Sequence, residues 1–359
     1  MPGEGASRAP FLMAGGGTGG HVIPALAVAR ELRRRGHDVF FVGTERGLEA
    51  RLVPAEGFEL KKIEIGGLNR VSARQKLATL ARLPFATLEC MNYRASAVFS
   101  MGGYVAGPAV MAALVKRVPV VVMEPNAVPG FTNRAIGRLA ARALIAFPET
   151  ARYFAPGKSE VTGLPVREEF FAIPPKPRGN RLQLLITGGS QGSRTLNRAS
   201  RESWPLFRAA GFPLRIVHQC GANGAEEMKQ AFAASALDGE VTPFIADMPA
   251  AFREADLVVC RSGAGAVAEL GAAGKPSILV PFPFAADDHQ TRNAEVIERA
   301  GAARLVRDAE MNGERLYTLV RELAAAEGVL ERMGAAARQF ARPGAARRAA
   351  EIMEEVARC

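Results

Sequence analysis

Short apolar runs alternate along the chain with longer segments whose apolar residues recur at helical spacing. In the first half, residues 11–14 and 39–42 are apolar runs of strand length, and residues 22–32 between them have the helical pattern. A glycine cluster precedes this segment and Gly36 follows it. The order predicts a strand, a tight turn, a helix and a second, parallel strand. The other strands predicted in this half are residues 60–65, 97–101, 118–123 and 143–146, with helices at 104–116 and 131–142.

The second half of the chain repeats this order. Residues 182–186 are an apolar run, residues 188–192 have the sequence GGSQG, and residues 195–210 have the helical pattern. Residues 148–177, between the halves, are rich in proline and glycine, which is typical of a linker. We therefore predict an α/β protein of two Rossmann-like domains. Further strands are predicted at 215–218, 241–244, 257–260 and 277–280, and the Ala/Arg-rich end 338–359 is predicted to be helical.

Composition narrows the choice of partner. A chain of 359 residues is long for a single core, and its formal net charge of +10 indicates an anionic partner, such as nucleic acid, a phosphorylated substrate or acidic lipid. Because only 7% of the residues are aromatic and no nucleic-acid-binding motif is recognisable, we expect no nucleic-acid partner. The four cysteines are scattered without metal-ligand spacing, so we expect a reducing cytosol and neither zinc nor another cofactor.

Any contact with a membrane is expected to be peripheral. The longest apolar run, residues 104–115, is far shorter than a bilayer span, and the N-terminus has no apolar core of signal-peptide length. Residues 69–94 interleave arginine and lysine with leucine, valine and phenylalanine, as helices lying on acidic bilayers do. A solvated amphipathic helix packed on a sheet has the same pattern, and Pro84 is expected to interrupt this one.

The glycine cluster at residues 15–20 matches the G-x-G-x-x-G of dinucleotide-binding turns. The match alone is weak, because that pattern also requires an acidic residue after the second strand to hold a ribose, and Glu45 is the only nearby candidate. The dinucleotide pattern has no need of His21, which lies where the turn becomes the helix. His21 is therefore either an ordinary polar residue of the first helical turn or a functional group.

At three places in the second half a predicted strand runs into a polar or glycine-rich turn before a helix: residues 188–192, 245–248 and 260–269. The third opens a helix whose free N–H groups and dipole favour a diphosphate. Glu269, about two turns into that helix, is suited to accept both hydroxyls of a ribose; the alternative is an ordinary exposed glutamate. Asp287 and Asp288 begin another helix, and their spacing is not the D-x-D that holds a metal-bound nucleotide sugar.

Six motifs, in order, resemble those of the MurG family. The resemblance extends over nearly the whole chain and rests on GGGTGGH (15–21), MGGYVAGP (101–108), GGSQG (188–192), FIADM (244–248), CRSGA (260–264) and DDHQTRNA (287–294). Members of this family are bacterial enzymes that transfer N-acetylglucosamine from UDP-N-acetylglucosamine to lipid I, giving lipid II in peptidoglycan synthesis. The resemblance implies a GT-B fold, in which two Rossmann-like domains face each other across a deep cleft. We place the domains at 1–163 and 164–341, with the helix 342–359 returning to the first.

The resemblance also implies which residues bind the donor. Thr18, Gly19 and Gly20 are expected near the sugar and diphosphate, Asn126 on the sugar, Arg167 and Ser190 by the phosphates, and Gln290 on the sugar hydroxyls. Ile245 is expected to hold the uracil and Glu269 the ribose, and the diphosphate is expected on Ala264, Gly265, Ala266, Val267 and Ala268. Pro125 and Leu164 stand where the family usually has Gln and Asn, which puts the local geometry in question more than the activity.

The reaction implied is a direct displacement that inverts an α-linked donor to a β-1,4-linked product. The acceptor hydroxyl must lose a proton as it attacks, and an imidazole with an ordinary pKa of about 6.5 accepts one at neutral pH. His21 is therefore the candidate base, with binding of the acceptor as its alternative role. Arg167, Ser190 and the helix after Ser262 would stabilise the departing diphosphate without a metal ion.

The partners expected from the resemblance are UDP-N-acetylglucosamine, lipid I and the anionic cytoplasmic face of the bacterial plasma membrane. Three alternatives remain at the level of sequence. One is a related GT-B enzyme, such as a UDP-N-acetylglucosamine 2-epimerase or another lipid glycosyltransferase. The others are a dinucleotide oxidoreductase, which would need the missing ribose acid, and a non-catalytic protein that binds nucleotide sugars.

Overall fold

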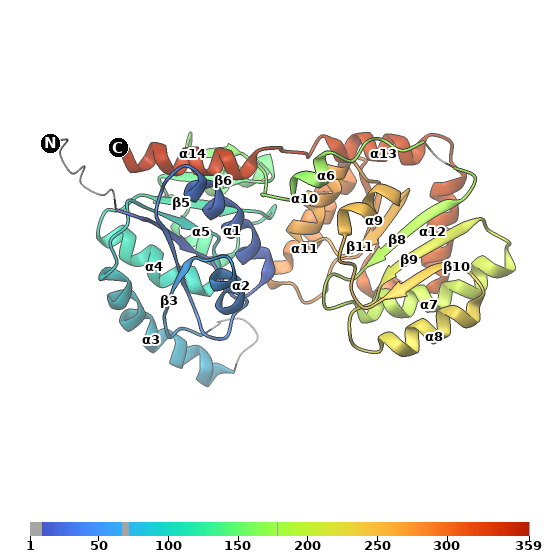
Figure 1. Ribbon diagram of the computed structural model, residues 1–359, viewed down its shortest axis with the longest axis horizontal. Helices are drawn as coiled ribbons and strands as arrows, with labels where there is room; N and C mark the ends of the chain where they lie inside the picture. Colours follow the sequence, from blue (N-terminus) through green and yellow to red (C-terminus); the bar gives the residue numbers. More distant parts are fainter. Residues whose placement is uncertain (1–8, 67–71, 178, 359) are drawn as a thin grey trace. The chain divides into compact units, whose positions relative to one another are not determined.

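The computed structural model describes residues 9–66, 72–177 and 179–358, which form two compact units (Figure 1). Unit 1 ends at Pro165 and resumes at Gly344, and unit 2 is Val166–Pro343. Each unit contains its own parallel sheet with helices between successive strands. The predicted class, an α/β chain of two Rossmann-like domains, is confirmed.

The described part of unit 1 has a seven-stranded parallel sheet in the order β3-β2-β1-β4-β5-β6-β7. β1 pairs with β2 on one side and with β4 on the other, and Phe11 lies opposite Val39 and Ala97. Because the strand order reverses at β1, the loops after β1 and β4 flank the switch point where open α/β sheets bind ligands. The strands are β1 (Phe11–Ala14), β2 (Val39–Gly43), β3 (Glu59–Lys62), β4 (Ala97–Ser100), β5 (Val120–Glu124), β6 (Arg142–Ile145) and β7 (Ser159–Val161).

Helices enclose the core of unit 1, and the last helix of the chain is one of them. α14 packs on α1, and its Ile352 and Met353 are fully buried. Arg348 of α14 donates two hydrogen bonds, of 2.7 and 3.0 Å, to the carboxylate of Glu160 in β7. The helices of unit 1 are α1 (Gly19–Arg34), α2 (Glu49–Ala55), α3 (Ala73–Met91), α4 (Gly103–Val115), α5 (Phe131–Ile136), the 3-10 helix η1 (Pro148–Tyr153) and α14 (Ala345–Arg358).

Unit 2 has a parallel sheet of six strands within its described residues, in the order β10-β9-β8-β11-β12-β13. Its strand order reverses at β8, so the loops after β8 and β11 flank a second switch point. The strands are β8 (Leu182–Thr187), β9 (Leu214–Gln219), β10 (Asp238–Thr242), β11 (Leu257–Cys260), β12 (Ser277–Leu279) and β13 (Ala303–Leu305).

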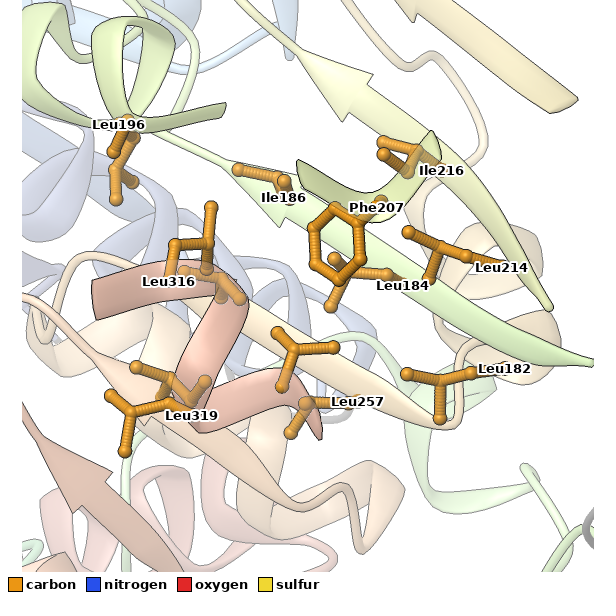
Figure 2. Packing of buried hydrophobic residues seen from close by; sticks show 14 of the residues in the cluster. Leu182, Leu184, Ile186, Leu196, Phe207, Leu214, Ile216, Leu257, Leu316 and Leu319 are labelled. Atoms are coloured by element: carbon orange, nitrogen blue, oxygen red, sulfur yellow. The ribbon is translucent and has the colours of Figure 1, made fainter. Parts of the chain in front are cut away.

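The core of unit 2 lies between this sheet and α7 and α12. Figure 2 shows Leu184 and Ile216 of the strands turned toward Phe207 of α7, with Leu316 of α12 beside them. These side chains are at most 1% exposed. The helices of unit 2 are α6 (Glu168–Phe171), α7 (Arg194–Ala209), α8 (Ala225–Ser235), α9 (Met248–Glu254), α10 (Ala264–Ala273), the 3-10 helix η2 (Ala286–Asp288), α11 (His289–Arg299), the 3-10 helix η3 (Asp308–Glu310), α12 (Gly313–Ala325) and α13 (Val329–Arg338).

Several local predictions are wrong. The predicted linker 148–177 contains η1, β7 and α6, because a three-residue strand such as β7 is too short to carry a periodic pattern. Pro84 lies inside α3 and does not interrupt it. The proline costs the helix one backbone hydrogen bond, and the packing of α3 on α4 offsets that loss. The helix α2 and the strand β13 were not predicted. Among the helices described, none is long and apolar enough to cross a membrane.

Candidate active site

In unit 1, the glycine-rich turn after β1 places His21 at the switch point of the sheet, between β1 and β4. Thr18 occupies the N-cap position of α1, where its carbonyl accepts the N–H groups of His21 and Val22 at 3.1 Å. The Nδ1 atom of His21 lies 3.2 Å from the carbonyl oxygen of Gly16. A Cβ added to Gly103, in the turn after β4, would come within 3.2 Å of the His21 ring. The two glycine turns predicted to be functional therefore meet at the imidazole, and Thr18, Gly19 and Gly20 precede it at the start of α1.

Glu49, which the sequence did not single out, lies beneath this turn. Its side chain is fully buried and accepts a hydrogen bond of 2.7 Å from the N–H of Gly17. Glu45, the acid considered for a ribose, is instead exposed and pairs with Lys62 at 3.1 Å. The acidic residue that contacts the glycine turn is therefore Glu49, the first residue of α2, and its sequence surroundings gave no signal of this role.

Asn126 is positioned by a buried carboxyl group at the end of β5. One oxygen of Glu124 accepts the backbone N–H and the side-chain amide of Asn126, at 3.0 and 3.1 Å. The other accepts the N–H of Gly130 and the amide of Asn133, at 3.2 and 2.9 Å. Burial raises the pKa of Glu124 to about 7, although these hydrogen bonds oppose the rise. Asn126 is thus fixed at the carboxyl end of the sheet, where the sugar contact was predicted.

In unit 2, a buried glutamine connects two of the predicted nucleotide loops. The carbonyl oxygen of the Gln219 side chain accepts the N–H of Ile245 at 2.8 Å, and its amide donates to the hydroxyl of Thr187 at 3.2 Å. That hydroxyl also accepts the N–H of Gly189 at 3.1 Å. The turn that carries Ser190 and the turn that carries Ile245 are therefore held to one side chain, and Ser190 itself is exposed.

The loop after β11 is held to α11, which brings the start of α10 close to Gln290. The hydroxyl of Ser262 donates to the backbone carbonyl of Gln290 at 2.9 Å, and a Cβ added to Gly263 would lie 3.7 Å from the Gln290 amide. Ala264 is the first residue of α10, so the helix begins beside Gln290. Its free N–H groups can donate hydrogen bonds to a diphosphate there. The carbonyl oxygen of the Gln290 side chain is bonded to the N–H of Phe282 at 2.9 Å, and its amide faces Gly263.

Glu269 and Arg167 lie in the same unit, and the charge of Arg167 acts on the carboxyl group of Glu269. Glu269 lies further along α10, after Gly265, Ala266, Val267 and Ala268, and is partly buried. Burial raises its pKa to about 7, and the charge of Arg167 opposes the rise. Arg167 is exposed at the N-cap position of α6, with its guanidinium over the ring of Phe170. Glu269 is therefore not an ordinary exposed glutamate, and its role at the ribose stays a prediction.

A hollow of about 800 Å³ adjoins these loops in unit 2. Gly188, Arg194, Arg261, Phe282 and Gln290 are among the residues that line it. Arg261 is paired with Asp308 at 2.5 Å, whereas the exposed Arg194 makes no ion pair with any residue that the structure describes. The surface is large enough for a nucleotide-sized ligand and carries positive charge, as an anionic ligand requires.

The other histidines have structural surroundings. His37 lies 2.7 Å from a carboxylate oxygen of Glu354 in α14, and His218 is fully buried in β9, where burial lowers its pKa to about 4. His289 accompanies Gln290 at the start of α11, with Nδ1 2.7 Å from the carbonyl of Ala286. Within residues 9–66, 72–177 and 179–358, no group of three or more His, Cys, Asp or Glu side chains is placed to hold a metal ion.

Two family models and several relatives of known name match this chain. The glycosyltransferase family 28 N-terminal domain matches residues 11–145, and the C-terminal domain of the same family matches residues 183–354. A protein of Solibacter usitatus (strain Ellin6076), named UDP-N-acetylglucosamine--N-acetylmuramyl-(pentapeptide) pyrophosphoryl-undecaprenol N-acetylglucosamine transferase, is 74% identical over 354 residues, which are 98% of this chain and 97% of the relative. A protein of the same name from Anaeromyxobacter sp. (strain Fw109-5) is 42% identical over 97% of this chain and 93% of its own length.

A solved structure agrees with these relatives. The crystal structure of Acinetobacter baumannii MurG is 35% identical in sequence, superposes with a TM-score of 0.80, and covers 97% of this chain and 99% of its own. The two family models together match residues in both units, and the Solibacter usitatus relative aligns over nearly the whole chain. The chain therefore belongs to the MurG family of glycosyltransferases, within glycosyltransferase family 28.

Proposed function

We propose that this protein transfers N-acetylglucosamine from UDP-N-acetylglucosamine to the C4 hydroxyl of N-acetylmuramoyl-pentapeptide on undecaprenyl diphosphate. The product is lipid II, the disaccharide-lipid precursor of peptidoglycan. The observation that carries this function is the 74% identity to the transferase of Solibacter usitatus over 98% of the chain. The buried polar network under the nucleotide loops and the imidazole between two glycine turns supply the chemistry that the reaction needs.

The donor belongs to unit 2 in this proposal. The uracil binds at Ile245, the ribose hydroxyls donate to Glu269, and the diphosphate lies on the N-terminus of α10 between Ala264 and Ala268. Gln290 and, from unit 1, Asn126 bind the sugar. Support comes from the way Gln219 and Ser262 hold these loops in fixed positions, because preorganised donors stabilise developing charge without reorganisation. Arg167 and Ser190 complete the stabilisation of the departing UDP.

The acceptor and its base belong to unit 1. His21 removes the proton of the C4 hydroxyl while the oxygen attacks the anomeric carbon, and the bond to UDP breaks in the same step. The turn that contains Thr18, Gly19 and Gly20 lies beside the reacting sugar. The position of His21 supports this assignment, because the imidazole stands at the switch point between β1 and β4, where ligands bind to open α/β sheets.

The lipid acceptor implies contact with the cytoplasmic face of the plasma membrane, and α3 is the surface that we propose for it. Leu77, Leu80, Phe85 and Leu88 of this helix are between 53% and 73% exposed. Arg74 and Arg82 are exposed on the same helix, and Arg82 is only loosely paired with Glu64, at 3.4 Å. Exposed apolar side chains beside cations favour an acidic bilayer. The start of the predicted segment, residues 69–71, lies outside the described residues.

One assay tests the function. The purified protein is incubated with labelled UDP-N-acetylglucosamine and a lipid I analogue, and the products are separated and analysed for a β-1,4-linked disaccharide-lipid. We expect that product together with release of an equal amount of UDP. Epimerised nucleotide sugar without disaccharide would instead favour a 2-epimerase, and donor binding without any product would favour a non-catalytic binding protein. Binding of NADH but not of UDP would favour an oxidoreductase.

A further inference from the structure

Glu49 is a buried acid that the reaction proposed above does not use. It begins α2, and its side chain is 0% exposed. One carboxylate oxygen accepts the backbone N–H and the hydroxyl of Thr44, at 3.0 and 2.8 Å, and the other accepts the N–H of Gly17 at 2.7 Å. In the described residues no cationic side chain pairs with it. A buried carboxylate needs such donors, because an unsatisfied one costs several kilocalories per mole or more.

Glycines make the space that this carboxylate occupies. A Cβ at Gly16 would lie 2.5 Å from a Glu49 oxygen, and one at Gly43 would lie 2.6 Å from the Glu49 Cγ. A Cβ at Gly47 would collide with the carboxylate even more closely. Three glycines, one in the turn after β1, one at the end of β2 and one in the loop that follows it, therefore surround this side chain. Within the 15–20 turn, the glycine at position 16 is explained by this close approach of Glu49, which requires no dinucleotide.

The contact to Gly17 fixes the turn that presents the predicted acceptor residues. Gly17 has a φ of +85°, a conformation that residues with a side chain rarely adopt. Because glycine has access to many other backbone conformations, neighbouring groups must hold it in this one. Glu49 holds its N–H, and the carbonyl of the preceding Gly16 contacts Nδ1 of His21 at 3.2 Å. The chain of contacts leads from Thr44 through Glu49 and the turn to the imidazole.

We infer that Glu49 is a positioning residue for the transfer: its buried carboxylate anchors the Gly15–Gly20 turn to the end of β2 and so sets the place of His21. The inference rests on the proposed function, in which His21 acts on the acceptor. Glu49 touches no substrate, because its side chain is fully buried. Its effect is therefore on the rate of transfer and on use of the acceptor, and not on binding of the nucleotide to unit 2.

The test uses Glu49→Gln, with Glu45→Gln as its matched control. The amide has the size of the carboxylate, but in either orientation it places an NH2 group against one of the two N–H groups that Glu49 now accepts. Glu45 is an acid in the same loop whose carboxylate is exposed and bonds only Lys62 among described residues. For both variants we would measure kcat and KM for each substrate, and hydrogen–deuterium exchange of the peptide that spans residues 15–21.

We expect Glu49→Gln to lower kcat/KM for the acceptor at least about tenfold, with KM for UDP-N-acetylglucosamine within about twofold of wild type. Exchange should accelerate in the 15–21 peptide and remain unchanged in the peptide that spans residues 188–192. Glu45→Gln should match wild type in both measurements. Wild-type kinetics and exchange in Glu49→Gln would overturn the inference, and so would an equal loss in Glu45→Gln.

Two further outcomes are decided by the same measurements. If Glu49→Gln does not fold, Thr44→Val removes only the hydroxyl that donates to Glu49, and it should show a smaller loss in the same direction; wild-type behaviour of Thr44→Val would then overturn the inference. If the wild-type protein makes no disaccharide-lipid, the proposed function fails. The exchange result still shows whether Glu49 holds the turn.

Discussion

Glu124 and Glu269 are two carboxyl groups whose pKa burial raises to about 7, yet their surroundings differ. Among the described residues, Glu124 accepts hydrogen bonds from Asn126 and Gly130 of the following loop and from Asn133 of α5, so the group is already satisfied and fixes Asn126. For Glu269, the one group within the described part of the chain that favours ionisation is the charge of Arg167. A carboxyl group left without donors at a ligand site is suited to take them from a ligand.

This difference predicts a pH dependence for binding of the donor. Below its pKa of about 7 Glu269 is protonated, and above it the group is ionised and accepts the ribose hydroxyls as a charge-assisted acceptor. Affinity for UDP-N-acetylglucosamine should therefore rise as the pH increases from about 6 to about 8, by up to about tenfold. Calorimetric titration measures this directly, and the diphosphate diester of the donor does not itself titrate in this range.

Glu269→Gln is the control for that experiment. The amide accepts hydroxyl donors but cannot ionise, so affinity should become independent of pH between the same limits. A pH dependence that persists in Glu269→Gln would assign the titration to another group and contradict the role of Glu269 at the ribose.

His21→Ala tests the assignment of the base. General bases contribute about 10²- to 10⁴-fold to a rate, so kcat should fall within that range while KM for UDP-N-acetylglucosamine stays within about twofold. His21→Gln keeps a polar side chain of similar length and should be as slow, because an amide cannot accept the proton. Turnover near that of wild type in His21→Ala, with both substrates bound normally, would exclude His21 as the base.

At the residue level, the sequence indicated glycine turns but not what they surround. The turn at 15–20 matched a dinucleotide pattern, and Glu45, the acid considered for a ribose, pairs with Lys62 instead. Glu49 was missed because a glutamate at the start of a helix is ordinary in sequence, and only the fold brings it 2.7 Å from the N–H of Gly17. Gln219 was missed for the same reason, since its bond to Ile245 joins the end of β9 to the loop after β10.

At the scale of elements, apolar runs predicted the central strands well and the edges poorly. β1, β4, β8 and β11 are almost entirely buried and therefore have mainly apolar sequence, with Gln183 in β8 and Ser100 at the end of β4 among the polar members. β7 consists of Ser159, Glu160 and Val161, and it is a strand because it pairs with β6 and because Arg348 of α14 binds its glutamate. That bond joins residues far apart in the chain, which a local pattern cannot show.

The exposed apolar side chains of α3 predict how the protein meets lipid. The triple variant Leu80→Gln, Phe85→Gln and Leu88→Gln removes apolar area that would enter the bilayer, so its binding to vesicles with anionic lipid should fall at least about tenfold in sedimentation assays. Turnover of a water-soluble acceptor analogue should remain within about twofold of wild type. Undiminished vesicle binding by the triple variant would exclude α3 as the contact surface.

The contribution of positive charge on α3 to vesicle binding is tested by two single variants, one on α3 and one on α12. Arg82→Gln on α3 should weaken binding to anionic vesicles, most clearly at low salt where attraction is least screened. Arg321→Gln removes an exposed arginine of α12, which lies in unit 2, and should leave vesicle binding unchanged. An equal loss in both variants would indicate a response to net charge rather than to α3.

On the scale of the whole molecule, each unit has a hydrophobic core of its own. The core of unit 2 is formed by strands β8, β9 and β11 with α7 and α12, and that of unit 1 by its own strands with α4. The chain crosses between the units at Pro165 and again at Pro343, so α14 completes unit 1 although it follows unit 2 in sequence. A ligand that binds to one unit should therefore raise the free energy of unfolding of that unit and not of the other.

UDP provides the test of this division. If its site lies wholly on unit 2, saturating UDP at about 100 times its Kd should stabilise unit 2 by about 2.7 kcal/mol and leave unit 1 unaffected. Hydrogen–deuterium exchange in increasing denaturant should show that protection in the peptides of β8 and β11, and not in those of β1 and β4.

Ile352→Ala, which truncates a fully buried side chain of α14, should lower the free energy of unfolding of unit 1 by about 2 to 4 kcal/mol and leave that of unit 2 unchanged. Because UDP acts on the other core, it should not restore the loss in Ile352→Ala; equal stabilisation of both sets of strands by UDP would mean that unit 1 also binds the nucleotide or that the two cores unfold together.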